Sequence, residues 1–169
     1  MRTLALLLTI LAVPAQAANF CGAMVMPAGA LGSISRGFSS YHSGIDLAAP
    51  LGSTIEAAAA GTVIYAGWYA GYGNMVDIQH ADGVVTRYAH MSAFVPSLGY
   101  GTAVKAGQVI GLVGHTGHAT GNHIHFEVRI NGYAVDPAPY IGLGSCPVQP
   151  PRVPVEEAYA PANAARAHH

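Results

Sequence analysis

The sequence predicts a mainly β domain with an antiparallel core, and three observations predict it. Short apolar runs recur through the middle of the chain, and each is long enough for one strand. Glycine-rich turn signals separate these runs at regular intervals, which is typical of hairpins. No segment repeats its apolar residues about every 3.6 positions over the length of a helix. The runs are 62–65, 75–78, 84–88, 108–113 and 124–130.

The turn signals explain where the predicted strands end. Asp82-Gly83 stands between two apolar runs and is the strongest of them, because a type I′ turn needs positive φ at both central positions. The segment 56–60 has helix propensity, but it is too short for a stable helix and Gly61 ends it. The turn signals are 71–74, 81–83, 105–107 and 131–132.

A chain of 169 residues is long enough for about one domain. Residues 1–17 combine a basic start, an apolar run over 4–13 and small residues at the end, the pattern of a secretory signal peptide. A membrane anchor is the alternative, but this run rises only ~15 Å as a helix against a ~30 Å hydrocarbon core. No later segment is long and apolar enough to span a bilayer. We therefore expect an exported protein, periplasmic or secreted, with its domain over 18–147 and a disordered Pro/Ala-rich tail over 148–169.

The two cysteines, Cys21 and Cys146, bracket nearly the whole expected domain. Export would place them in an oxidising compartment, where a disulfide could tie the two ends together. Closing a loop of that length is worth roughly 4–5 kcal/mol in the chain-entropy account. Two unpaired thiols remain the alternative, since spacing alone supplies no geometry.

The charge of the chain excludes one class of partner. Charged residues make up 9% of the sequence and the formal net charge is −1. Nucleic-acid binding requires a basic stripe or patch, and the sequence has none. The nine histidines are more informative, because several have spacings that indicate a metal site.

The segment 123–128 carries the first candidate group. Strand alternation places His123, His125 and Glu127 on one face and three apolar side chains on the other. Two histidines one pleat apart are ~6.6 Å apart along the strand. That separation suits one metal ligand with a neighbouring catalytic group better than two ligands of one ion.

His42 and Asp46 form the second candidate group. A straight strand would hold them ~13 Å apart, too far to share an ion whose bonds are ~2.0–2.2 Å long. A bend at Gly44 would bring them together. The alternative is a turn with an ordinary salt link.

His90 is the third candidate, and strand alternation predicts that it shares a face with Thr86 and Tyr88. Alone, His90 would be interpreted as a structural histidine.

Taken together, the three groups resemble the lysostaphin-type zinc metallopeptidases, which are cell-wall endopeptidases with H-x(3)-D and H-x-H motifs. The first motif is His42-x-x-x-Asp46, and the second lies in the segment 116–127 after the Tyr-Ala-His of 88–90. Flanking segments at 44–50, 59–63, 71–74 and 104–108 match as well. The resemblance runs from about Ile34 to Pro137 and implies an antiparallel sheet with a shallow groove holding the metal.

The resemblance implies a role for each matching residue. His42, Asp46 and His125 would bind one Zn²⁺ per chain and leave a fourth position open for water. His123 would be the general base and His90 would orient the water or stabilise the oxyanion, although the two could exchange roles.

The implied function is hydrolysis of peptide bonds in peptidoglycan stems or cross-links, with zinc-bound water as nucleophile. Two alternatives stay open: a non-catalytic module that binds the wall or activates another wall hydrolase, and a secreted protease for glycine-rich proteins. Glu127 is a rival base, ~6.6 Å further along its strand than His125. The approach to His42 over 36–41 is short, which indicates an open groove and leaves the substrate contacts and any regulatory protein unidentified.

Overall fold

The computed structural model describes residues 20–146, so the expected signal peptide (1–17) and tail (148–169) lie outside the described residues. The described part contains ten strands and the short 3₁₀ turn η2 (Ala81–Gly83). The strands are β1 (Ser33–Arg36), β2 (Ile45–Ala48), β3 (Thr54–Glu56), β4 (Gly61–Tyr69), β5 (Gly73–Gln79), β6 (Val84–Phe94), β7 (Ala103–Val104), β8 (Val109–Val113), β9 (His123–Ile130) and β10 (Tyr133–Val135). Within residues 20–146 no helix has the length and apolar character needed to cross a bilayer.

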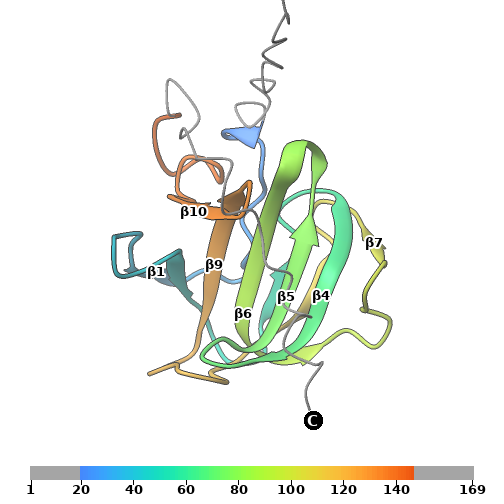
Figure 1. The fold of residues 1–169 in the computed structure, drawn as a ribbon. Helices are drawn as coiled ribbons and strands as arrows, with labels where there is room; N and C mark the ends of the chain where they lie inside the picture. The colour runs from blue at the N-terminus through green and yellow to red at the C-terminus, as the bar shows by residue number, and fades with distance from the viewer. Residues whose placement is uncertain (1–19, 147–169) are drawn as a thin grey trace, which may run out of the picture.

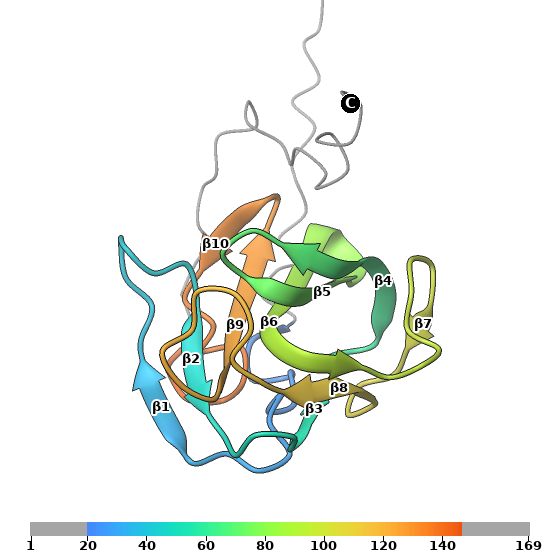
Figure 2. The same cartoon turned by 90° about the horizontal axis from the view of Figure 1, so that it is seen from below.

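The prediction of a mainly β, antiparallel fold is confirmed. One path through the sheet runs β1-β2-β9-β6-β5-β4-β7, with β10 beside β9, β8 beside β6 and β3 beside β8 (Figures 1 and 2). Each of the five apolar runs lies, to within one residue, inside one of the longer strands, which are β4, β5, β6, β8 and β9. The strands that the sequence did not indicate are two to four residues long.

The core is enclosed because β6 changes partners along its length. Its first part pairs with β5 and β9, and its last part, from Met91 to Phe94, pairs with β8. Figure 2 shows β6 curving towards β8 and β3. Tyr88 and Phe126 are fully buried in this core with their ring centroids 5.4 Å apart. Burying a side chain of that size is worth about 1.5–3 kcal/mol.

Two hairpins have the turns that the sequence predicts. Asp82 and Gly83 have φ of 60° and 72° between β5 and β6, and Asn131 and Gly132 have φ of 51° and 87° between β9 and β10. Positive φ at both positions matches the right-handed twist of the flanking strands. These turns fix the register of β6 and β9, the two strands that lie beneath the candidate site.

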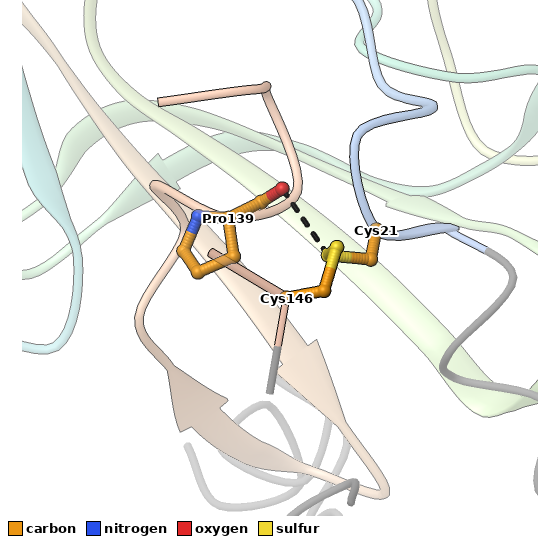
Figure 3. Close-up of a disulfide and its surroundings, with 3 residues drawn as sticks. All are labelled: Cys21, Pro139 and Cys146. Atoms are coloured by element: carbon orange, nitrogen blue, oxygen red, sulfur yellow. Dashed lines mark hydrogen bonds between the residues drawn. A yellow bond between two sulfur atoms is a disulfide. The ribbon is translucent and has the colours of Figure 1, made fainter. Parts of the chain in front are cut away.

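Cys21 and Cys146 are joined by a disulfide, with their Cα atoms 5.7 Å apart. Figure 3 shows the bridge against Pro139, whose carbonyl oxygen lies 3.4 Å from the Cys21 sulfur. A disulfide sulfur has no proton, so this is a packing contact, and it is the Gly22 N–H that donates to the same oxygen at 2.9 Å. The expected pairing of the two cysteines therefore joins the two ends of the described chain.

Candidate metal centre

Strands β2 and β9 bring the two histidine motifs together. They are antiparallel neighbours, and Asp46 lies directly opposite His125 in their register. His125 Nδ1 is 2.9 Å from Asp46 Oδ1, and His42 Nε2 is 3.1 Å from each of these two atoms. The three candidate ligand atoms therefore converge on one place, and all three residues are buried.

The loop before β2 determines how His42 faces the site. Ser39 and His42 exchange backbone hydrogen bonds of 3.0 Å, which close a tight turn. The His42 ring then places Nδ1 2.8 Å from the Gly37 carbonyl oxygen and Nε2 towards Asp46. The chain bends at Ser43 and Gly44 directly before β2, as the sequence predicts, and Gly44 is required there for a second reason. A Cβ at Gly44 would lie 2.3 Å from the Phe126 carbonyl oxygen, so β9 passes too close for any side chain.

The proton positions show that these residues fit a metal ion. A carbonyl oxygen only accepts, so the His42 proton is on Nδ1, towards Gly37. His125 Nε2 lies 3.0 Å from Glu127 Oε1, which places its proton on Nε2. With neutral rings, His42 Nε2, His125 Nδ1 and an oxygen of Asp46 direct lone pairs at one another with no proton between them. Two imidazole nitrogens and one carboxylate oxygen are a ligand set that Zn²⁺ takes in catalytic sites.

Ionised carboxylates surround this centre on two sides. Burial opposes ionisation of Asp46, but its hydrogen bond with His125 and the nearby histidines outweigh that effect and lower its pKa. Burial also opposes ionisation of Glu127, and His125 and Arg87 more than compensate, so its pKa falls well below the usual range. His125 lies between these carboxylates. Burial disfavours its charged form, but a second proton on Nδ1 would bond to Asp46, and together with the bond to Glu127 this raises the pKa of His125. A metal ion at the site would take the place of that second proton.

His123 and His90 lie beside the three candidate ligands, with their ring centroids 4.7 Å apart. His123 Nδ1 is 2.9 Å from the Gly121 carbonyl oxygen, and His90 Nδ1 is 2.7 Å from the Thr116 carbonyl oxygen. Both rings are thus held by Nδ1 and leave Nε2 available, and His123 Nε2 lies 3.7 Å from Asp46 Oδ1. Burial lowers the pKa of His90, which favours its neutral form.

The prediction that His90 shares a face with Thr86 and Tyr88 is wrong. Thr86 and Tyr88 are completely buried and their hydroxyl groups bond to each other, whereas His90 lines the groove. The physical reason is a β-bulge. Tyr88 pairs with Val76 and Met91 pairs with Asn74, so two residues of β6 oppose one of β5. His90 has φ of 61° in this bulge, which turns its side chain to the other side of the sheet.

Glu127 is placed behind His125 and away from the groove. Its side chain is fully buried, and Oε1 accepts hydrogen bonds from Ser43 at 2.6 Å and Tyr72 at 2.7 Å, as well as from His125. The other oxygen accepts from Arg129. A carboxylate with all these partners is suited to hold His125 in orientation and is poorly placed to act as a base.

Sequence reasoning missed the residues around Glu127. Arg87 lies opposite both Glu127 and Asp77 in register, donates two 2.8 Å hydrogen bonds to Asp77, and packs 4.8 Å over the Tyr72 ring. A signal was present, because charged residues in the middle of buried strands are rare unless they are paired. Asp77, Arg87 and Glu127 are three such residues on the adjacent strands β5, β6 and β9, and together they would have indicated an ionic cluster.

All five residues expected at the site line a single open groove of about 500 Å³. Its remaining wall comes from the β1–β2 region, the turn before β5 and the loop before β9. Those additional residues are Ser35, Arg36, Tyr41, Ser43, Gly71, Tyr72, His118 and Thr120.

Comparisons with known proteins identify relatives of this chain. The sequence model of Peptidase family M23 matches residues 40–137. DD-carboxypeptidase/endopeptidase Mpg of Neisseria meningitidis serogroup B is 52% identical over 96 residues, which cover 57% of this chain and 22% of Mpg. This chain therefore spans about a fifth of the length of that relative.

Two solved structures share the fold. Csd3 of Helicobacter pylori has a TM-score of 0.63 at 41% identity, covering 70% of this chain and 33% of Csd3. The antimicrobial peptidase lysostaphin of Staphylococcus simulans has a TM-score of 0.59 at 30% identity, covering 73% of this chain and 55% of lysostaphin.

Proposed function

The chain belongs to peptidase family M23, and on that premise we propose that it is a zinc-dependent endopeptidase that hydrolyses peptide bonds in the stems or cross-links of peptidoglycan. One observation carries the proposal: two nitrogen lone pairs and a carboxylate oxygen converge beside two further histidines whose Nε2 atoms are available. Such an arrangement offers three ligands, an open position and proton-transfer groups in one groove.

His42, Asp46 and His125 would hold the zinc ion. When bound, Zn²⁺ supplies a Lewis acid that makes water nucleophilic near neutral pH. Glu127 would fix the proton of His125 on Nε2 and so keep Nδ1 directed at the ion.

His123 would act as the general base. Its Nδ1–H donates to the Gly121 carbonyl oxygen, so the neutral ring presents an acceptor at Nε2 close to Asp46. That atom would take the proton of the attacking water and return it to the leaving amine. His90, held in the same way by Thr116, would orient the water through its own Nε2.

The substrate is proposed from the relatives and from the groove. Mpg is described as a DD-carboxypeptidase/endopeptidase and lysostaphin as an antimicrobial peptidase. An open groove of about 500 Å³ has room for an extended peptide. The disulfide suits an oxidising compartment. This supports export to the periplasm or the exterior, in line with the signal peptide expected over residues 1–17.

Digestion of purified peptidoglycan tests the proposal. The protein should release peptide fragments detectable by mass spectrometry, lose that activity with a chelator and regain it with added zinc. A His125→Ala variant should release none. Should folded, zinc-loaded protein release no fragments and instead stimulate a separate wall hydrolase, the non-catalytic interpretation would replace this one.

A further inference from the structure

Arg36 is a cation at the edge of the groove, and it lies directly opposite a candidate metal ligand. It is the last residue of β1, and its partner across the β1–β2 pair is Asp46. The β1–β2 register shifts between Ile34 and Arg36, so Ser35 and Arg36 together stand opposite Asp46. Both residues line the groove that carries the site.

The charge of Arg36 is not used within the described structure. Across residues 20–146, the ion pairs shorter than 4.0 Å do not include Arg36. Asp46 Oδ1 lies within 4.0 Å of a ring nitrogen of His42, His123 and His125, and no such pair joins it to Arg36 within the described residues. The guanidinium makes one long hydrogen bond, 3.4 Å from Nη2 to the Tyr41 carbonyl oxygen. Arg36 is an exposed residue of the groove lining.

The structure holds the backbone of Arg36 in place on both sides. Ser35 Oγ donates to the backbone carbonyl of Asp46 at 3.2 Å. The Gly37 carbonyl accepts the His42 Nδ1–H at 2.8 Å. The base of the Arg36 side chain is therefore tied to two candidate ligands through its immediate neighbours.

The groove offers Arg36 no acidic partner of its own. Asp46 is the one carboxylate among the lining residues, and its Oδ1 lies among the candidate ligand atoms of His42 and His125. Arg36 is the one Arg or Lys among the lining residues, so its guanidinium is the group of the groove that is complementary to an anion. A planar guanidinium binds a carboxylate through two parallel hydrogen bonds, which makes this pairing specific in geometry as well as in charge.

We propose that Arg36 is a specificity-determining residue that binds a free carboxylate of the peptide substrate. This inference rests on the proposed function and narrows its substrate class. The preferred substrate carries a carboxylate close to the cleaved bond, either at the chain terminus or on an acidic side chain. A neutral glycine-rich bridge would lack the group that Arg36 binds.

Matched synthetic stem peptides test this in four forms: both carboxylates free, the C-terminal one amidated, the side-chain one amidated, and both amidated. Wild-type protein should lose roughly 10–100-fold in kcat/KM when the recognised carboxylate is amidated, the usual size of a hydrogen bond to a charged group. The pattern of loss distinguishes the two carboxylates. Arg36→Gln should cleave the free-acid peptide with a kcat/KM reduced by the same factor relative to wild type. On the amidated peptide its kcat/KM should equal that of wild type. Arg36→Lys should be intermediate, and Lys105→Gln, an exposed cation outside the groove, should behave as wild type.

Two outcomes would overturn the inference: equal losses by Arg36→Gln on acid and amide, or no loss on either. Calorimetric titration of the metal-depleted full chain with the same peptides gives a readout that needs no turnover. If the metal-depleted protein binds the free-acid peptide through Arg36 and the zinc-loaded protein cleaves no peptide, the proposed function is refuted and the carboxylate site stands. If the zinc-loaded protein cleaves the free-acid and amidated peptides with equal kcat/KM, the proposed function stands and the carboxylate site is refuted.

Discussion

His125 and Glu127, two positions apart on β9, face each other through Nε2 and Oε1 at 3.0 Å. Alternation puts both side chains on one face of the strand, and Phe126 between them enters the core. A carboxylate behind a ligating histidine fixes its tautomer and raises its basicity as a ligand. The orientation of a candidate ligand thus depends on a residue that does not line the groove.

Replacing Glu127 with Gln should weaken zinc binding about 10–100-fold, the usual effect of losing such a partner. Competition with a chromophoric chelator measures this, and circular dichroism checks that the variant is folded. Tyr72→Phe, which removes one hydrogen bond to the same carboxylate oxygen, is the matched control and should have a smaller effect. Unchanged zinc affinity in Glu127→Gln would show that the contact does not position His125.

His125→Ala and His123→Ala should separate metal binding from proton transfer. The first removes a ligand and should abolish both zinc content and activity. The second should retain most of its zinc and lose roughly 10²–10⁴-fold in rate, the range for a general acid–base group. Metal analysis of both purified variants, combined with rates on peptidoglycan, makes the comparison. Comparable zinc loss in the two would contradict their assigned roles.

The backbone at His90 predicts an order of stability among its variants. Because φ is 61° there, asparagine should be tolerated and a β-branched residue should be strained. His90→Val should therefore be less stable than His90→Asn by about 1–2 kcal/mol in urea unfolding, while both lose activity. Equal stabilities would indicate that the bulge relaxes when the histidine is removed.

His80 predicts a pH dependence of folding away from the groove. It is buried, with Nδ1 2.8 Å from the Ala60 carbonyl oxygen and Nε2 2.7 Å from Thr86 Oγ1, and burial lowers its pKa. The unfolded chain binds this proton at a higher pH than the native state does, so the unfolding free energy falls as pH drops below about 6.5. The stabilising effect is fully present above that pH.

Denaturant unfolding of the metal-free protein between pH 8 and 5.5 measures this dependence. His80→Gln should reduce the fall in stability on the acid side, and the comparison with wild type removes the contributions of the other histidines. The decisive quantity is the slope with pH, because the substitution also changes stability at every pH. Identical slopes in the two proteins would show that His80 titrates alike in the folded and unfolded states.

The sequence predicted the long strands well because each needs its own apolar run and turn. Val84–Tyr88 and 124–130 could be placed for that reason. The short strands β1, β2 and β3 could not, since three or four residues carry no period and form only because a neighbour pairs with them. Their pairing is what places Arg36 opposite Asp46.

The spacing of the motifs predicted which residues form the candidate site. The orientation of a side chain was mispredicted where the backbone departs from a regular strand. Alternation correctly put His125 and Glu127 on one face, but it failed at His90, because a bulge cannot be seen in an apolar pattern. The contacts of Glu127 with Ser43 and Tyr72 come from segments far apart in the chain. Only the folded arrangement brings them together.

The bridge between Cys21 and Cys146 turns the described main chain into a closed ring. A proteolytic cut at an exposed turn, such as the one around Tyr100, would open the ring without releasing a fragment. The nicked molecule would stay one covalent piece until a reductant reached it. That topology keeps both walls of the groove on one covalent chain after a single cleavage.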